Sequence, residues 1–187
     1  MHLFKSSRPN LLHFVTSVTY KRVPIFLEER FCELFVEALK LSKEDRPFNL
    51  LGYVVMPDHV HLLINPLDKD IRRTMNAIKG RSAAAILKEM RRGLSDDYLD
   101  RLSFMARTGR RQTHKVWQTG FSSIDVSSEK FIRQKLKYIH LNPVRAGLID
   151  HPARWRFSSF AAYLPHRQGD VPMEIDSRGY WNKDELR

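Results

Sequence analysis

The sequence predicts an α+β fold of the ferredoxin-like (split βαβ) kind, with an antiparallel four-stranded sheet and helices on one face. Strand-like and helical segments follow one another as strand, helix, strand, strand, helix, strand, and a further helix comes after them. A Pro-Asp turn joins the second strand directly to the third. The 187 residues are 42% hydrophobic, which is enough for one domain with its own core.

The first half of the chain predicts three strands and a helix. Residues 11–20 are rich in β-branched and aromatic side chains, as strands are. Residues 27–44 carry apolar side chains at helical spacing, which predicts an amphipathic helix. Residues 48–56 and 59–66 predict the two strands of a hairpin around the Pro-Asp turn.

The second half predicts two helices, an insertion and the last strand. Residues 70–92 predict a helix with a basic face, which a glycine at position 80 weakens or kinks. Residues 93–115 are polar and basic and predict a loop or a partly helical insertion. Residues 115–126 predict a strand with a glycine bulge, and residues 127–141 predict the third helix.

The ends of the third helix and the tail give further expectations. Ser127 or Ser128 is expected to cap the start of the helix. Asn142 followed by Pro143 is expected to end it. Four aromatic side chains of the tail are expected to pack back on the body: Trp155, Phe157, Phe160 and Tyr163.

One domain is expected over residues 1–165, with 93–115 as an insertion loop and 166–187 as a C-terminal tail. Cys32 is the only cysteine and lies among apolar residues, so we expect a buried small hydrophobe and exclude disulfides and cysteine-zinc sites. The sequence holds no run of about 18 apolar residues and does not start like a signal peptide. These features suit the cytoplasm.

Positive charge is concentrated in two segments. The net charge is +11, and residues 70–115 hold twelve Lys and Arg against five Asp and Glu. Residues 129–156 hold seven against two. Such patches favour a phosphate backbone as partner, with an affinity that depends on salt. The alternative is a basic protein that has no polyanionic partner.

Two histidines share one face of the third predicted strand. His59 and His61 are separated by one residue, and alternate side chains of a strand point the same way. Val60, Leu62 and Ile64 then face the packed helices, so both imidazoles point to the opposite face. Imidazoles about 7 Å apart along a strand can converge on one metal ion. Solvated histidines at a sheet surface are the alternative.

Two histidines alone are rarely a complete site, and the third predicted helix offers a further ligand and a reactive group. At about 100° per residue, an apolar stripe runs from Ile132 to Ile139. Tyr138 and Asn142 lie beside each other off this stripe, one turn apart, and Gln134 lies one turn before Tyr138. Two alternatives stay open at this point. Tyr138 can be a half-buried core residue, and Asn142 can be an N-cap that precedes a proline at N1.

With these residues in place, the sequence resembles the HUH-type single-tyrosine transposases of the IS200-like family, and among them the REP-associated tyrosine transposases. GYVVMPDHVHLLI is similar to the HUH motif, in which a hydrophobic residue separates two histidines. KYIHLNPVRAGLI resembles the tyrosine helix, and WRFSSFAAY resembles a segment that follows in the REP-associated branch. The family usually has Asn where this chain has Asp58, and the insertion 93–115 is longer than in minimal members.

The resemblance implies a metal-dependent nuclease and strand transferase with its catalytic tyrosine helix on the other face of the sheet. His59 and His61 would hold a divalent ion, Mg²⁺ or Mn²⁺, with Asn142 as the third ligand and Gln134 as the alternative third ligand. Tyr138 would attack a phosphodiester of single-stranded DNA, form a 5′-phosphotyrosine and free a 3′-OH.

The resemblance also implies the partner, which is single-stranded DNA with REP-type hairpins, and a protein that acts as a monomer or a homodimer. The basic segments then supply candidate DNA contacts, although a basic helix face is often only solvated. The candidates are Arg72, Arg73, Lys79 and Arg81 in the second helix, Arg110 and Arg111 in the insertion, and Arg133, Lys137 and Arg145 near the tyrosine.

A non-catalytic nucleic-acid-binding protein with a ferredoxin-like fold is the alternative function. RNA-recognition domains of this kind present aromatic side chains on the central strands, where bases stack. Here the predicted free face carries histidines instead, which argues against that alternative.

Overall fold

The structure is a computed structural model that describes residues 12–94, 96–105, 112–164 and 172–176. Within this part of the chain, an antiparallel sheet has the strand order β2-β3-β1-β6. Its strands are β1 (Leu12–Val18), β2 (Phe48–Met56), β3 (His59–Pro66) and β6 (Ser122–Val126). This order and the antiparallel pairing confirm the predicted ferredoxin-like arrangement.

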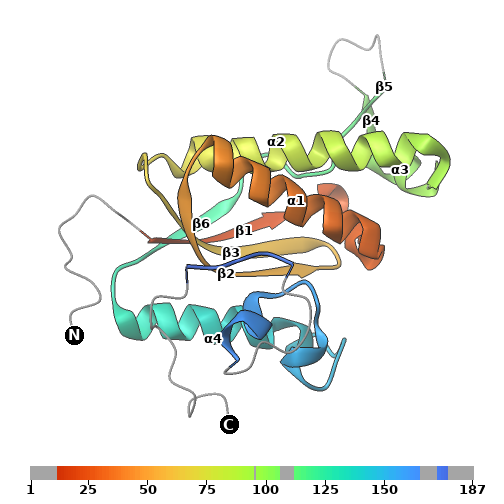
Figure 1. The fold of residues 1–187 in the computed structure, drawn as a ribbon. Helices are drawn as coiled ribbons and strands as arrows, with labels where there is room; N and C mark the ends of the chain where they lie inside the picture. Colours follow the sequence, from red (N-terminus) through yellow and green to blue (C-terminus); the bar gives the residue numbers. More distant parts are fainter. Residues whose placement is uncertain (1–11, 95, 106–111, 165–171, 177–187) are drawn as a thin grey trace.

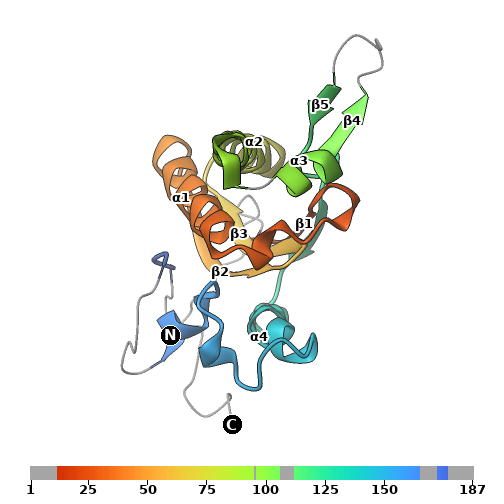
Figure 2. The ribbon, with the colours of Figure 1, turned by 90° about the vertical axis from the view of Figure 1, so that its right-hand side faces the viewer.

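Helices cover both faces of this sheet (Figure 1). The helices α1 (Glu29–Asp45) and α2 (Ile71–Glu89) lie side by side on one face. The helix α4 (Glu129–Arg145) lies on the other face, as the turned view in Figure 2 also shows. The face opposite α1 and α2 is therefore not open, which removes the flat platform that an RNA-recognition domain would use.

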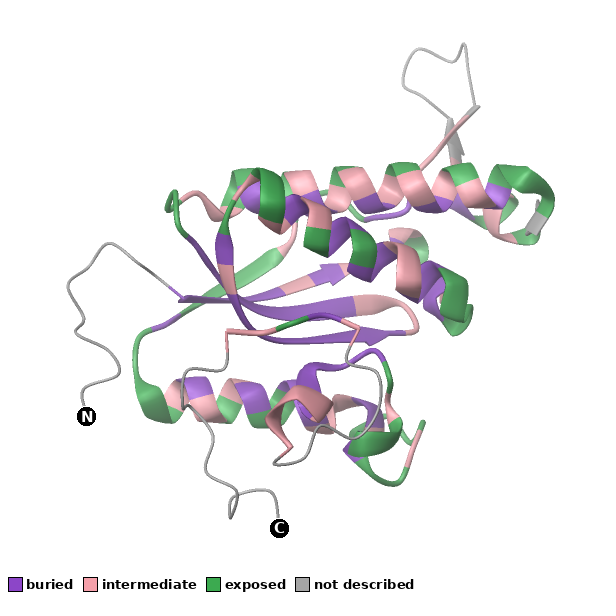
Figure 3. Ribbon diagram, viewed as in Figure 1, coloured by how far each residue is buried: buried purple, intermediate pink, exposed green. Residues whose placement is uncertain are grey.

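The sheet separates two buried apolar layers, and the purple strands in Figure 3 run between them. Val60, Leu62 and Ile64 of β3 pack into the layer under α1 and α2, as the alternation predicts. Leu63 packs into the second layer, together with Leu136 and the other apolar residues of α4. The predicted apolar stripe of the third helix is therefore the face that α4 buries.

A glycine lets α4 approach the sheet closely. Gly52 lies in β2 next to a shift of the pairing register, and a Cβ atom there would be 2.6 Å from Leu136 Cδ2. Any side chain at this position would push Leu136 aside. Because Leu136 precedes Tyr138 by two residues, this contact also helps to set the position of the tyrosine.

The expectation that α4 ends at Asn142 is wrong, because the helix continues to Arg145 with Pro143 inside it. A proline in a helix removes one main-chain hydrogen bond and favours a break. Here the last turn is closed instead by Gly147, whose φ is +69°: its N–H and that of Leu148 donate to Val144 O and Pro143 O. Asn142 is therefore an interior helical residue and not an N-cap.

The insertion is partly helical, one of the two forms expected for residues 93–115. The helix α2 runs through Gly80 without interruption and ends before the tight turn Met90–Leu94, in which Gly93 has a φ of +98°. The short helix α3 (Asp96–Leu102) follows, and β4 (Ser103–Met105) pairs with β5 (Gln112–His114). Figure 1 shows this pair projecting away from the sheet.

The last strand of the sheet is shorter than the expected 115–126. Trp117 makes an isolated bridge with Thr19 at the end of β1, and its indole Nε1 donates to Ser82 Oγ at 3.0 Å. Gly120 then adopts a φ of +75°, which turns the chain before β6 begins. The glycine therefore marks a turn between two pairings rather than a bulge in one strand.

The segment after α4 covers the outer edge of β2. Val55 N donates to Phe157 O at 2.9 Å, and Ser158 bridges Val54. The indole of Trp155 donates to Val55 O at 2.9 Å, and Phe157 is buried. The expected packing of the aromatic tail is thus confirmed, and it blocks an edge strand that could otherwise pair with another chain.

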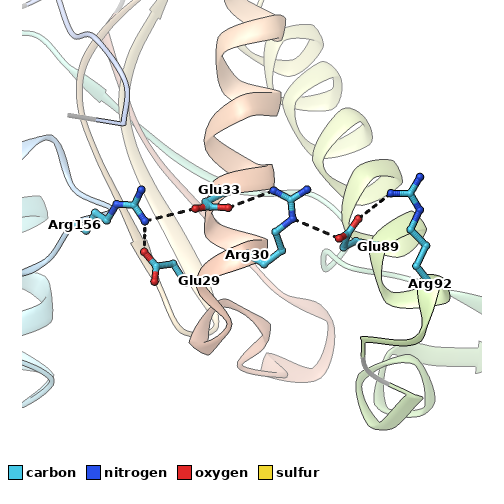
Figure 4. A network of polar contacts seen from close by, with 6 residues as sticks. All are labelled: Glu29, Arg30, Glu33, Glu89, Arg92 and Arg156. Atoms are coloured by element: carbon cyan, nitrogen blue, oxygen red, sulfur yellow. Dashed lines mark hydrogen bonds and ion pairs between the residues drawn. The ribbon is translucent and has the colours of Figure 1, made fainter. Parts of the chain in front are cut away.

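Ion pairs tie this segment to the two helices of the opposite face (Figure 4). Arg156 contacts two carboxylates of α1, and Arg30 of α1 joins one of them to α2. Apart from the more buried Glu89, these side chains are substantially solvent-exposed. Each exposed pair contributes little, at most about 1 kcal/mol. The network consists of Glu29, Arg30, Glu33, Glu89, Arg92 and Arg156.

Cys32 is buried, as predicted, and its Sγ lies 3.2 Å from Phe26 O. Burial, followed by the charges of Glu29 and Glu33, raises the pKa of its thiol to about 12. A thiol with such a pKa is unreactive at neutral pH. Among the residues that the structure describes, no helix is long and apolar enough to cross a membrane.

Candidate active site

The strand β3 places His59 and His61 on the sheet face that α4 covers. Their ring centroids are 4.8 Å apart, and the rings meet edge to face at 77°. The rings are thus closer than the spacing along the strand alone suggests. His61 is only 4% exposed, whereas His59 is partly exposed.

The helix α4 brings Tyr138 against the same histidines. Its ring lies 5.3 Å from His61 and 5.7 Å from Phe14, centroid to centroid. Phe14 in turn stacks on His61 at 5.2 Å. Tyr138 nevertheless stays 37% exposed, in contrast to the fully buried Tyr53. The phenol ring therefore lies at the surface, against the rings of Phe14 and His61. This position disfavours the interpretation of Tyr138 as a core residue.

His61 is held by its neighbour on β1. Thr16 lies directly opposite in the pairing register, and its Oγ1 is 2.8 Å from His61 Nδ1. The Nε2 atom of His61 is buried and has no hydrogen-bond partner among the described residues. Burial lowers the pKa of His61 to about 3, aided by the charges of His59 and Lys135. The ring is therefore neutral at physiological pH.

His59 is held by the residue that precedes it. His59 Nδ1 lies 2.6 Å from Asp58 Oδ1, and Arg22 donates to Asp58 Oδ2 at 2.8 Å. Burial opposes ionisation of Asp58, but the hydrogen bonds from His59 and Arg22 hold the pKa of its carboxyl below the ordinary value. Asp58 is therefore a stable acceptor for the Nδ1–H of His59.

This pattern fits a divalent metal ion. When Nδ1 of an imidazole donates to a protein oxygen, Nε2 carries the lone pair that a metal binds. A buried nitrogen without a partner, such as His61 Nε2, is costly unless something occupies it. Among the described residues, His, Cys, Asp and Glu form no group of three that could hold a metal. A third protein ligand would have to be of another type.

Asn142 and Gln134 are the two candidates for that ligand from the sequence. Both lie on α4, one turn after and one turn before Tyr138. Asn142 is partly buried, whereas Gln134 is exposed. The difference in burial favours Asn142 as the residue closer to the sheet.

Two cations lie beside the tyrosine. Lys135 Nζ is 6.0 Å from the centroid of the Tyr138 ring and 4.5 Å from that of Phe14. Arg145 Cζ is 5.7 Å from the Tyr138 centroid. Arg145 was among the DNA-binding residues expected from the sequence, but Lys135 was not. Its position three residues before Tyr138 on a helix is the signal that could have identified it.

The structure does not bring the four basic residues of α2 to this site, because α2 lies on the opposite face of the sheet. Lys79 donates to Gln118 O and Gly120 O, and burial lowers the pKa of its ammonium group. Of the other three, Arg72 is exposed, Arg73 forms an ion pair with Asp70, and Arg81 forms an ion pair with Asp45.

Of the remaining expected DNA contacts, Arg133 and Lys137 lie on α4. Arg133 pairs with Glu129 at 2.8 Å, and Lys137 is exposed. Arg110 and Arg111 lie outside the described residues.

The residues that support the histidines were missed by sequence reasoning. Phe14 and Thr16 are two apart on β1, so the alternation of a strand puts them on one face. In the pairing register Thr16 lies opposite His61 and Phe14 lies opposite Leu63, and the sequence did not reveal this register. Arg22 reaches Asp58 from a turn that has no glycine to mark it.

Comparison with known proteins agrees with this fold. The family model described as "Transposase IS200 like" matches residues 9–142 of the 187. The chain therefore belongs to the IS200-like transposase family.

Two relatives indicate which members of the family this chain resembles. A protein of Haemophilus influenzae named "Putative REP-associated tyrosine transposase" is 26% identical over 94% of this chain and 90% of its own length. The "REP-associated tyrosine transposase" of Escherichia coli is 27% identical over 68% of this chain and 64% of its own length.

A solved structure shares the fold. A REP-associated tyrosine transposase bound to a REP hairpin superposes with a TM-score of 0.63 at 21% identity. The match covers 95% of this chain and 93% of that one.

Proposed function

We propose that this transposase cleaves and rejoins single-stranded DNA at REP-type stem-loops through a 5′-phosphotyrosine on Tyr138. The observation that carries the proposal is the position of Tyr138, 5.3 Å from His61 and half-exposed on the histidine face. The REP-associated relatives and the related structure with a REP hairpin support the DNA substrate.

Tyr138 would be the nucleophile in a transesterification. Its oxygen attacks the scissile phosphorus, the bond from phosphorus to the 3′ oxygen breaks, and the phenol proton ends on that oxygen. The 3′-OH of a second strand end then attacks the phosphotyrosine and releases Tyr138. Each step exchanges one phosphate ester for another, so joining needs no external energy source.

The protein has to make the phenol reactive. A free tyrosine has a pKa of about 10, so forming the phenolate at pH 7 costs about 4 kcal/mol. Lys135 and Arg145, beside the ring, would attract the phosphate of the substrate. The contacts with the rings of Phe14 and His61 orient the ring of Tyr138.

His59, His61 and Asn142 would hold a divalent metal ion, Mg²⁺ or Mn²⁺. When bound, such an ion withdraws charge from the scissile phosphate and stabilises the negative charge that develops on it. Nitrogen ligands match Mn²⁺ better than Mg²⁺. The support in this chain is the buried Nε2 of His61 and the oxygen partners at both Nδ1 atoms.

We infer that the scissile strand runs along α4, because the cations nearest the tyrosine lie there. These are Lys135 and Arg145, and Arg133 and Lys137 lie on the same helix. The cations of α2, on the other face, could contact only a different part of a folded DNA. A monomer and a homodimer are both compatible with this path.

The test is the covalent adduct. Labelled single-stranded hairpin DNA is incubated with the protein and Mn²⁺ or Mg²⁺, and a denaturing gel detects the protein–DNA adduct. Tyr138→Phe should abolish the adduct and leave DNA binding almost unchanged, because affinity comes from the cations. Tyr98→Phe, which alters a tyrosine of α3 packed on Phe31, is the matched control and should give the normal adduct. Normal adduct yield in Tyr138→Phe would refute the assignment.

A further inference from the structure

The turn after β1 holds two residues in an unfavourable backbone conformation. Lys21 has a φ of +53° and Arg22 a φ of +55°, and neither is a glycine. The left-handed region costs a residue with a side chain about 1–2 kcal/mol. Two such residues in succession persist only when the surrounding contacts hold them there.

The contacts of this turn lead to the proposed metal site. Arg22 donates to Asp58 Oδ2 at 2.8 Å, and the other carboxylate oxygen lies 2.6 Å from His59 Nδ1. The main chain of Asp58 is fixed as well, because Thr19 N–H donates to Asp58 O at 2.9 Å and Thr19 Oγ1 lies 2.9 Å from the same oxygen. Arg22, Asp58 and His59 thus form one continuous series of hydrogen-bonded contacts.

The Arg22–Asp58 ion pair does not by itself offset the strain of this turn. The Arg22 side chain is 64% exposed, and exposed ion pairs contribute about 0–1 kcal/mol. The strain of Lys21 and Arg22 together is larger than that, at about 2–4 kcal/mol. Main-chain hydrogen bonds such as that from Tyr20 N–H to Val116 O at 2.8 Å hold the turn, and the turn places the guanidinium of Arg22 on Asp58.

We propose that Arg22 is a positioning residue for the metal site: through Asp58, it fixes the ring of His59 so that Nε2 faces the ion. The inference rests on the proposed metal site. A carboxylate that is bound at one oxygen can rotate, whereas Asp58 is held at both. The partner of the buried His61 is the neutral Thr16, so the charged support belongs to the more exposed of the two histidines.

Calorimetric titration of the full-length protein with Mn²⁺ tests the inference. Arg22→Gln should weaken Mn²⁺ binding about tenfold or more, the size of effect typical of residues that orient metal ligands. Arg22→Lys keeps the cation and should restore most of the affinity. Lys21→Gln is the matched control, because it removes the neighbouring charge from the same strained turn. The Lys21 ammonium lies over the ring of Tyr20 instead, so this variant should bind like the wild type.

A double variant separates positioning from a general effect on folding. Arg22→Gln and Asp58→Asn act on one series of contacts, so combining them should weaken binding no further than the stronger single variant. Additive losses would contradict the series, and so would an Arg22→Gln protein that binds Mn²⁺ like the wild type. Equal losses in Lys21→Gln and Arg22→Gln would show a mere charge effect and would overturn the proposal. A wild type that binds no Mn²⁺ would instead refute the metal site itself.

Discussion

The two faces of the central sheet differ in what their buried residues do. Under α1 and α2, β3 contributes Val60, Leu62 and Ile64 to a mainly apolar layer. Under α4, the same strand contributes His59 and His61, which lie beside a half-exposed tyrosine. One strand therefore supplies the core and the proposed chemistry at alternating positions. Stability and activity should respond separately to substitutions that are one residue apart.

Cations differ between the two faces in the same way. On α2, Lys79 and Arg81 are bound to carbonyl oxygens and to Asp45 of the protein itself. On α4, Lys135 and Arg145 lie over the ring of Tyr138. Cations that look alike in the sequence therefore have different roles. Those of α2 bind groups of the fold itself, whereas those of α4 lie next to the proposed nucleophile.

Neighbouring substitutions in β3 should give the largest separation between the faces. Leu62→Ala should lower the free energy of unfolding by about 2–5 kcal/mol, because Leu62 is fully buried. The folded fraction should still bind Mn²⁺. His59→Ala should abolish Mn²⁺ binding and metal-dependent cleavage at a smaller cost in stability, because His59 is partly exposed. Urea unfolding and calorimetric titration measure the two effects.

His61→Ala completes this comparison on the same face. It should also abolish Mn²⁺ binding, with a larger cost in stability than His59→Ala because His61 is buried. If neither histidine variant changed the affinity for Mn²⁺, the ion would have to bind elsewhere.

Acid should act mainly through the α4 side, which carries two buried neutral histidines. Burial lowers the pKa of His140 to about 3, and that of His61 by a similar amount. The unfolded chain takes up these protons near pH 6.5, whereas the folded protein does not. Stability is therefore full above about pH 6.5 and falls as the pH drops towards 3. At pH 5 the loss should be about 2 kcal/mol for each histidine.

His140→Gln should remove one of these two contributions. Urea unfolding at pH 7 and pH 5 should show a loss about 2 kcal/mol smaller in the variant than in the wild type. Comparing each protein with itself cancels the cost of losing the contact between His140 and Ser159. An identical loss in both proteins would mean that other groups govern the acid response.

The smallest expected difference between the two faces lies in the salt dependence of DNA binding. Each phosphate contact changes the slope of log K against log salt concentration by about 0.7 for single strands. Arg145→Gln, on the tyrosine face, should reduce the slope by that amount. Arg72→Gln, an exposed cation of α2, should leave it unchanged if the DNA follows α4 alone. An equal reduction in both variants would show that the DNA contacts both faces.

Periodicity was enough to predict the main features of the fold, whereas the resemblance to IS200-like transposases predicted that the tyrosine helix covers the histidine face. The alternation in β3 put the histidines on the face opposite Val60 and Leu62, and the spacing on α4 put Tyr138 off the buried stripe. Both patterns are local, and burial enforces them. The register of the sheet then brought the two elements together.

Features that depend on distant partners were not predictable. Pro143 was expected to end the helix, but its burial and the turn at Gly147 keep it helical. The contact between Thr16 and His61 depends on pairing between residues 45 apart. The turn that carries Arg22 contradicts local preference, since a left-handed conformation without glycine has no sequence signal.

The covered edge of β2 has a consequence for the chain while it is being made. Trp155 leaves the ribosome 100 residues after Val55, the residue whose carbonyl it binds. Until then, an outer strand of the nascent sheet has free amide and carbonyl groups, which another unfinished chain could join. The segment after α4 therefore closes this edge of β2 only after all four strands of the sheet have been synthesised, which limits the time during which nascent chains on the same messenger RNA could associate through it.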